Sequence, residues 1–176
     1  MVLQRISSLL KETFFDCSYV TASEIEPFDY LIAIAETNSK EKRKMIKIMA
    51  FEQQLDPSIL KKIDKDRCFR IQFLHQLPFE VNPLAVNQIA SLLLFLNQNL
   101  DWPGFELDEL NNRLTYRYNW LIKESSIDTA QLTIITGNLL LSLDMFNDAI
   151  KQIADGQLTF NELLKGIAEF GHRTKN

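Results

Sequence analysis

Glycine, histidine and cysteine are scarce in this sequence, and their scarcity excludes several kinds of functional site. The 176 residues include five glycines, two histidines and two cysteines. No G-x-G-x-x-G or Walker-type glycine–lysine loop occurs, so the usual phosphate-binding loops are missing, and G-x-S-x-G and H-E-x-x-H are missing too. One histidine, His172, lies near the end of the sequence, which leaves too few for a histidine-rich metal site. We therefore expect no catalytic residues, no cofactor and no metal ion.

Positive charge and long apolar runs are also lacking, which argues against nucleic acid or a membrane as a partner. The net charge is −4 and the pI about 5.2, whereas both of those partners bind clustered basic surfaces. The one basic run, residues 40–44, is interrupted by Glu41 and is typical of a solvated hairpin tip. The longest apolar cluster, residues 89–96, is too short to span a bilayer. The first 14 residues lack the features of a signal peptide, so we expect a soluble, cytoplasmic protein.

The remaining reactive side chains form no recognisable constellation. Cys17 and Cys68 fall in different predicted elements without metal-ligand spacing. In a reducing cytosol they are expected to be reduced thiols, although a disulfide between them stays open. The neighbouring acids Glu24 and Glu26 are interpreted as solvated surface rather than as a general acid and base.

Hydrophobic periodicity predicts short strands between amphipathic helices. Apolar residues recur at helical spacing over residues 2–15. Strands are predicted at residues 28–36, 45–52, 68–79, 105–107 and 114–121. Helices are predicted at about residues 83–99, 128–154 and 159–170, with a further helical turn after residues 56–57. Their starts are marked by Asp56-Pro57, by Asn82-Pro83, by Asp128 with Gln131, and by Thr159 with Glu162.

The predicted order is α-β-β-β-α-β-β-α, followed by a short C-terminal helix. Hairpins placed between helices predict an α+β fold, with an antiparallel sheet of about five strands and helices on one face. No repeat, low-complexity tract or linker interrupts the sequence. We therefore predict a single domain over residues 1–176, with a core at residues 1–156 and a terminal helix and tail at residues 157–176.

His75 is the strongest catalytic candidate, and its position favours a packing role. It falls in the apolar phase of the predicted strand at residues 68–79. A catalytic role would require an activated nucleophile beside it. Cys68 lies seven residues away, which on a regular strand places it on the opposite face and ~23 Å along the axis. We therefore interpret His75 as a packing residue whose ring is bonded to the backbone or half exposed.

The first two predicted strands are apolar in both phases, which is unusual for a sheet with one solvated face. One set of side chains can serve the core; the other must be covered by the first helix or by another protein. A two-sided core and an interface both stay open, although methionines suit an adaptable contact surface. The candidate partner-binding residues are Tyr30, Ile32, Met45, Met49 and Phe51.

The second half of the chain carries a family resemblance. The run "LPFEVNPLAVNQIASLLLFLNQNL", followed by "GFELDELNNRLTYRYNWLI", joins a Leu-Pro strand end to a helix, an F-x-L-D strand, a short turn and an aromatic alternating strand. With the order of elements and the acidic charge, this pattern resembles the type III secretion chaperone-like fold, and within it the YbjN-type branch. The resemblance covers about residues 1–156. The additional helix at residues 160–170 and the length depart from the typical secretion chaperone.

The resemblance implies a small, chaperone-like cytoplasmic module that binds protein and has no enzymatic activity. Our preferred hypothesis is a non-enzymatic protein- or peptide-binding module that holds its client on the apolar surface of the first two strands. The alternative is a structural or regulatory homodimeric subunit that uses the same surface for self-association. No nucleic acid and no membrane partner is expected.

Overall fold

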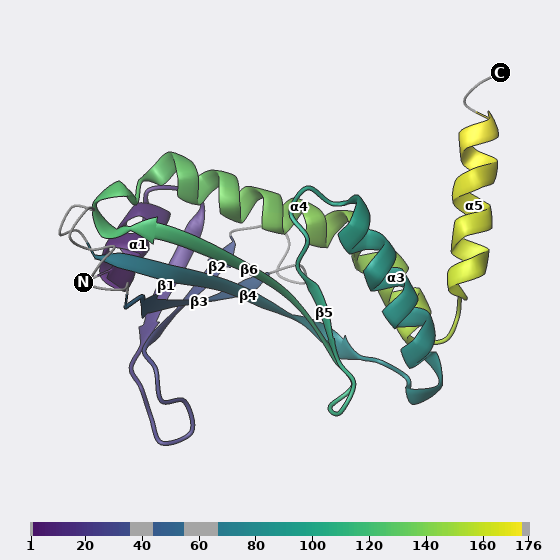
Figure 1. The fold of residues 1–176 in the computed structure, drawn as a ribbon, viewed down its shortest axis with the longest axis horizontal. Helices are drawn as coiled ribbons and strands as arrows, with labels where there is room; N and C mark the ends of the chain where they lie inside the picture. The colour runs from purple at the N-terminus through teal and green to yellow at the C-terminus, as the bar shows by residue number, and fades with distance from the viewer. Residues whose placement is uncertain (1, 36–43, 55–66, 174–176) are drawn as a thin grey trace. The chain divides into compact units, whose positions relative to one another are not determined.

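The computed structural model describes residues 2–35, 44–54 and 67–173, and it confirms the α+β fold. The sheet is antiparallel, with the strand order β1-β2-β3-β4-β6-β5 (Figure 1). The elements in chain order are α1 (Val2–Lys11), β1 (Phe15–Val20), β2 (Tyr30–Ala35), β3 (Met45–Glu52), β4 (Cys68–Glu80), the 3-10 turn η2 (Pro83–Ala85), α3 (Val86–Asn99), β5 (Phe105–Asp108), β6 (Arg113–Lys123), the 3-10 turn η3 (Glu124–Ser126), α4 (Thr129–Ala154) and α5 (Phe160–Arg173).

The sheet has six strands rather than about five, because residues 15–20 form the strand β1. The prediction of a helix over residues 2–15 was therefore too long. Helix α1 ends at Lys11, where the backbone N–H and the hydroxyl of Thr13 both bond to the carbonyl of Leu10, at 3.0 and 2.6 Å. The side-chain bond ties that carbonyl into a turn that competes with a further helical turn. The sequence FDCSYV that follows is rich in aromatic and β-branched residues, which favour a strand.

The chain divides into two compact units, and the prediction of a single domain stays a prediction. Unit 1 comprises Met1–His75 and Arg117–Leu140; unit 2 comprises Gln76–Tyr116 and Leu141–Asn176. Strands β4 and β6 and helix α4 contribute residues to both.

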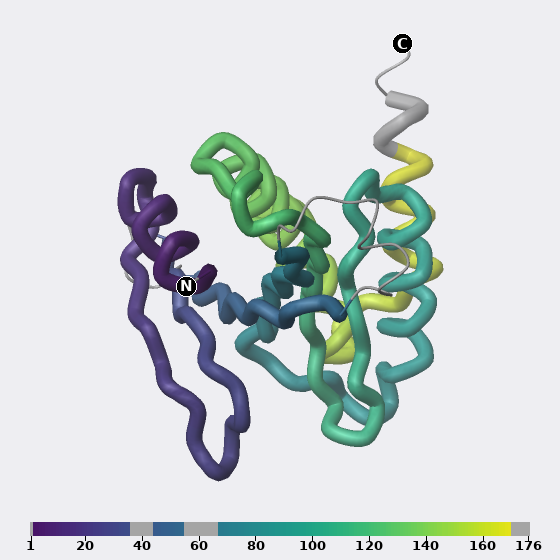
Figure 2. The backbone as a smooth tube through the Cα atoms, turned by 60° about the vertical axis from the view of Figure 1, so that its left-hand side comes forward, coloured from purple at the N-terminus to yellow at the C-terminus, as the bar shows by residue number. Residues whose placement is uncertain are grey.

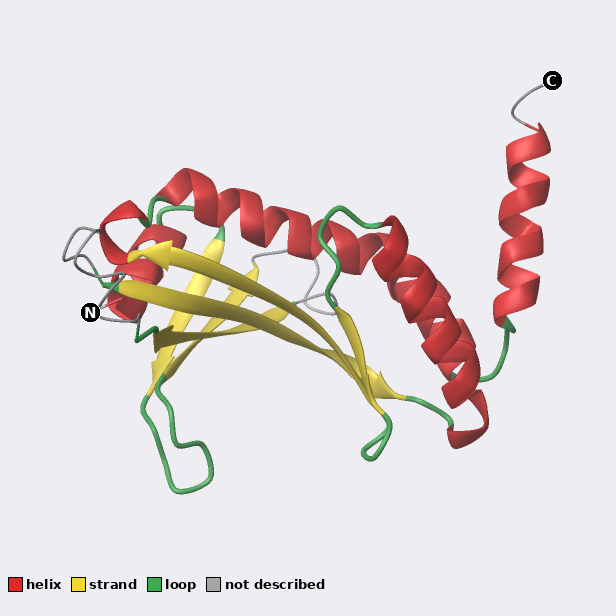
Figure 3. Ribbon diagram, in the orientation of Figure 1, coloured by secondary structure: helices red, strands yellow, loops and turns green. Residues whose placement is uncertain are grey.

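Unit 1 holds the antiparallel ladder from β1 to β4, with helices on one face (Figure 3). Helix α1 packs against β1, β2 and β3. It buries Ile6 and Leu10, which recur at the spacing of a helical stripe. Arg5 ties α1 to the connection that precedes α4, because its guanidinium donates to the carbonyls of Glu124 and Ile127 at 2.9 and 2.7 Å.

Unit 2 holds the β5–β6 hairpin, α3, the end of α4 and α5. The hairpin turns at Asn112, which adopts a positive φ of 54°, a conformation that asparagine tolerates. Asn97 of α3 holds the start of β5, since its side chain bonds to the carbonyl and the N–H of Phe105 at 2.8 and 3.1 Å. Helix α4 ends before Gly156, whose φ of 75° suits a left-handed C-terminal cap.

The capping signals at Asp128 and Thr159 are confirmed, whereas Asn82-Pro83 caps the 3-10 turn η2 and α3 begins three residues later, at Val86. Asp128 accepts a hydrogen bond from the backbone N–H of Gln131 at 2.8 Å. Thr159 and Glu162 bond reciprocally at the start of α5, as in a capping box. The expected helical turn after residues 56–57 and the basic run at residues 40–43 lie outside the described residues.

Candidate functional site

The five candidate partner-binding residues of the sequence lie on one face of the sheet in unit 1. Cross-strand partners share a face, and side chains alternate between faces along a strand. Tyr30 pairs with Met49, Ile32 with Lys47, and Ile34 with Met45. We call this the outer sheet face. It comprises Tyr30, Ile32 and Ile34 of β2, Met45, Lys47, Met49 and Phe51 of β3, and Arg70, Gln72 and Leu74 of β4.

The opposite, inner face carries the core of unit 1. The alternate residues of the same strands are fully buried there: Leu31, Ala33, Ile46, Ile48, Ile71 and Phe73. On the outer face the apolar side chains are half-buried, and Met45 is 54% exposed. Of the two apolar sets that the sequence left open, the structure therefore assigns Leu31, Ile46 and Ile48 to the core.

Cationic side chains cover the aromatic rings of the outer sheet face. The ammonium of Lys47 lies 4.0 Å from the centre of the Tyr30 ring. The guanidinium of Arg70 lies 4.5 Å from the centre of the Phe51 ring, and it also donates to Asn119 Oδ1 at 3.1 Å. Each arrangement is within the range of a cation–π interaction. The face therefore combines apolar area with fixed positive charge.

Two side chains of the loop between β1 and β2, residues 21–29, contact this face. Figure 2 shows the backbone of this hairpin in purple. Glu26 forms an ion pair with Lys47. The bond from Lys47, together with one from the Tyr30 hydroxyl, holds the pKa of Glu26 below its usual value. Two residues further on, the ring of Phe28 meets the ring of Phe51 edge-on, with 5.5 Å between centroids. The loop thus places a carboxylate and an aromatic ring on the outer sheet face.

Hydrogen bonds within the β1–β2 hairpin order the loop. The N–H of Ser23 donates to the carbonyl of Glu26 at 2.7 Å, and the N–H of Glu26 donates to the Ser23 hydroxyl at 3.1 Å. Asp29 accepts from the N–H of Ala22 at 2.8 Å and from the hydroxyl of Tyr19. These two donors, the Tyr19 hydroxyl first, lower the pKa of Asp29.

His75 lies on the inner phase of β4, where it is buried. Its Nδ1 lies 2.8 Å from the backbone carbonyl of Met45. Because a carbonyl can only accept, Nδ1 carries the proton and donates it. Burial lowers the pKa of His75 below its ordinary value, which keeps the ring neutral near pH 7. This geometry suits a packing residue that joins β3 to β4.

The cysteines lie apart in the fold. Cys17 is buried on the inner phase of β1, and burial raises the pKa of its thiol. Cys68 begins β4 and is half-buried, and both thiols are free. Within residues 2–35, 44–54 and 67–173, no cluster of three His, Cys, Asp or Glu side chains could hold a metal ion.

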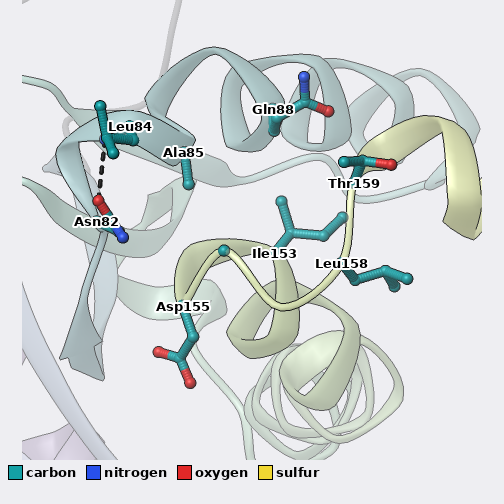
Figure 4. Close-up of a pocket in the computed structure, with 9 residues that line it drawn as sticks. Asn82, Leu84, Ala85, Gln88, Ile153, Asp155, Leu158 and Thr159 are labelled. Atoms are coloured by element: carbon teal, nitrogen blue, oxygen red, sulfur yellow. Dashed lines mark hydrogen bonds between the residues drawn. The ribbon is translucent and has the colours of Figure 1, made fainter.

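A cavity of about 250 Å³ lies in unit 2, where η2, α3, the end of α4 and the start of α5 meet (Figure 4). Its polar side chains already have partners that fix the ends of these elements. Asn82 accepts from the N–H of Leu84, Gln88 from the N–H of Phe160, Asp155 pairs with Lys151, and Thr159 bonds to Glu162. We therefore interpret the cavity as a junction between helices. The candidate site is the outer sheet face.

Sequence reasoning missed the charged members of the candidate site. Lys47 and Arg70 are single cations within apolar strands, and Glu26 was interpreted as solvated surface. The contact of Glu26 with Lys47 spans 21 residues, and that of Arg70 with Asn119 spans 49. The alternation of side chains along β3 was an available signal. Lys47 lies between the core residues Ile46 and Ile48, so its side chain points to the opposite face.

No family model matches the chain, and no curated protein is found to be similar to it. In the described part of the chain, the helices are too short or too polar to cross a membrane.

Proposed function

We propose that this chain is a cytoplasmic, non-enzymatic module that binds a protein or peptide segment on the outer sheet face. The observation that carries the proposal is the asymmetry of β2 and β3. Both phases of these strands are apolar, but one set is fully buried under helices while the other is half-buried, with Met45 54% exposed. A contiguous apolar surface rimmed by polar groups is typical of a protein interaction site.

The physical chemistry of the face supports an adaptable contact. Methionine has an unbranched and polarisable side chain that adjusts to different partners, and Met45 and Met49 both lie on this face. At ~25 cal/mol per Å² of apolar area removed from water, covering a few hundred Å² contributes several kcal/mol before the entropic cost of association. That cost decides whether a lasting or a transient complex forms.

The resemblance to YbjN-type proteins of the type III secretion chaperone-like fold points in the same direction, since it implies a chaperone-like protein-binding module. The same resemblance implies that homodimers are common, and a second copy would use the outer sheet face by the same chemistry. The non-enzymatic part of the proposal is supported by His75, the strongest catalytic candidate, whose ring is buried and bonded to a backbone carbonyl.

The test compares Met49→Asp with the wild type in two measurements. Multi-angle light scattering gives the oligomeric state, and affinity capture from native lysate with mass spectrometry gives associated proteins. We expect Met49→Asp to stay folded by circular dichroism and to lose self-association or specific capture. Lys165→Glu, a charge change on an exposed residue of α5, is the control that should lose neither. A monomeric wild type whose captured proteins are unchanged by Met49→Asp contradicts the proposal.

A further inference from the structure

The loop at residues 21–29 shows which chemical groups the outer sheet face accepts. It offers two groups to that face, the carboxylate of Glu26 and the ring of Phe28, separated by one proline. In an extended segment, residues i and i+2 point to the same side and lie about 7 Å apart. The loop is bent at residues 24–26 and at Phe28 rather than extended, so the acid and the ring are related by their separation of two residues in the sequence.

The receiving groups of the face are Lys47 and Phe51, which lie four residues apart on β3 with the row of Tyr30 and Met49 between them. The Lys47 ammonium reaches back over the ring of Tyr30, which stands opposite Met49 on β3. The aromatic contact is made by Phe51, two residues after Met49, so about 7 Å separates the two rows of the sheet. An acid-binding position and an aromatic-binding position thus lie in adjacent rows on one face.

The charge of the face favours an acidic partner. Lys47 and Arg70 lie on it. On β6, the side chain of Asn119 accepts a hydrogen bond from Arg70, and Arg117, two residues earlier, points to the same side of the strand. The chain as a whole carries a net charge of −4. When Glu26 is displaced from Lys47, the charges of Lys47 and Arg70 give that face a potential complementary to carboxylates.

The contacts between the loop and the outer sheet face are made by partly exposed side chains. Its backbone bonds from Ser23 and Glu26 run within the loop, and its contacts with β3 are made by side chains. The side chain of Glu26 is 42% exposed, Phe28 is 57% exposed, and Ile25 is 92% exposed. A partner with the same two groups can therefore replace the loop without breaking a strand pairing.

We propose that the partner of the outer sheet face is a protein segment with a carboxylate at one position and an aromatic side chain two residues later. It takes the positions of Glu26 and Phe28, and the loop at residues 21–29 competes with it in the free chain. This inference rests on the function proposed above, because it assumes that the face binds a protein segment at all.

The test uses the loop's own sequence as a peptide probe. A fluorescein-labelled peptide, TASEIEPFD, is titrated against the full-length wild type and against the double variant Glu26→Ala, Phe28→Ala, with fluorescence polarisation as the readout. A tethered segment competes at an effective concentration in the millimolar range. We therefore expect the peptide to bind the double variant about tenfold or more tightly than the wild type, and binding to weaken as salt is raised.

Charge exchange isolates the acid-binding position. Adding Lys47→Glu to the double variant should abolish binding of TASEIEPFD, and the exchanged peptide TASEIKPFD should restore it. Lys165→Glu in the same background is the matched control and should leave binding unchanged. Circular dichroism of each variant confirms that it is folded; if Lys47→Glu is not, Lys47→Gln replaces it, with weakened rather than abolished binding expected.

Two outcomes would overturn this inference without deciding the proposed function. If the peptide binds the double variant and its Lys47→Glu derivative equally, or binds neither, the acid-and-aromatic specificity is wrong. The Met49→Asp comparison then decides the function separately, because a loss of self-association or capture in that variant still supports a binding face with a partner of different chemistry.

Discussion

Adjacent residues of β3 should respond in opposite ways to the same substitution, because Ile48 and Met49 point to opposite faces of the sheet. Ile48 is 0% exposed and stands opposite Leu31 and Phe73 in the core of unit 1. Met49 is half-buried on the outer sheet face, opposite Tyr30. The comparison between them measures which face is core.

The expected magnitudes follow from burial. Truncating a fully buried isoleucine to alanine costs about 2–5 kcal/mol, and a carboxylate at that place adds the cost of desolvating a charge. Since a domain is stable by about 5–15 kcal/mol, Ile48→Asp should unfold the protein. Met49→Ala loses part of its contacts and should cost roughly 1 kcal/mol. Met49→Asp should stay folded because water reaches that face.

Urea unfolding followed by circular dichroism checks both pairs. The alanine variants give measurable free energies of unfolding even if Ile48→Asp never folds, with the midpoint shift interpreted at constant m-value. Ile48→Ala should be less stable than Met49→Ala by more than about 1 kcal/mol. Equal losses for the two alanine variants, or unfolding of both aspartate variants, would mean that β3 is buried on both faces, and the outer sheet face would no longer be a binding site.

Three further predictions concern groups outside that comparison. Because burial lowers the pKa of His75 in the folded state, the unfolded chain binds more protons below pH ~6.5. The contribution of His75 to stability should therefore be full above that pH and decline as pH falls. In urea titrations, His75→Gln should flatten this decline and shift the free energy of unfolding at pH 7.5 by no more than roughly 1–2 kcal/mol. Equal slopes of the free energy of unfolding against pH in the wild type and the variant would contradict the argument. At pH 8 a thiol reagent should modify Cys68 before Cys17, whose burial raises its pKa, and the difference should vanish in urea; fast modification of folded Cys17 contradicts its burial under α1. Asp128→Ala removes the N-cap of α4 and should cost about 1 kcal/mol, measured as a lower urea midpoint; an unchanged midpoint shows that the cap is dispensable.

The helices of the second half could be predicted because their signals are local. Asp128 and Thr159 each bond to a backbone N–H three residues away, so the start of each helix depends on a stretch of four residues. The end of α4 carries a local signal too, because Gly156 adopts a positive φ that few other residues adopt readily. Long-range bonds reinforce these boundaries, since the N–H of Asn82 donates to the carbonyl of Ala154 and the N–H of Phe160 to Gln88.

Strand β1 could not be predicted in the same way, because its stability is not local. Its apolar residues continue the stripe of α1, so a helical period fits the sequence up to residue 15. Its hydrogen bonds run to β2, where Phe15 pairs with Ala35 and Val20 with Tyr30. The alternation of side chains in β2 and β3 showed that each strand has two apolar sets. Which set faces the helices is known only from the packing of α1 against β1, β2 and β3.

The role of Glu26 shows why the candidate site was harder to predict than the fold. An acid in a loop is usually solvated, and nothing within a few residues of Glu26 argues otherwise. Its partner Lys47 becomes a neighbour only because β2 pairs with β3 in one register, which brings Tyr30 opposite Met49 and turns the loop onto the outer sheet face. A shift of that register by one residue would reverse the faces of β3, placing Lys47 in the core and Ile48 outside. The hydrophobic pattern therefore fixes the register, because this register buries Ile48 in the core. The position of Lys47 on the outer sheet face follows from the same register.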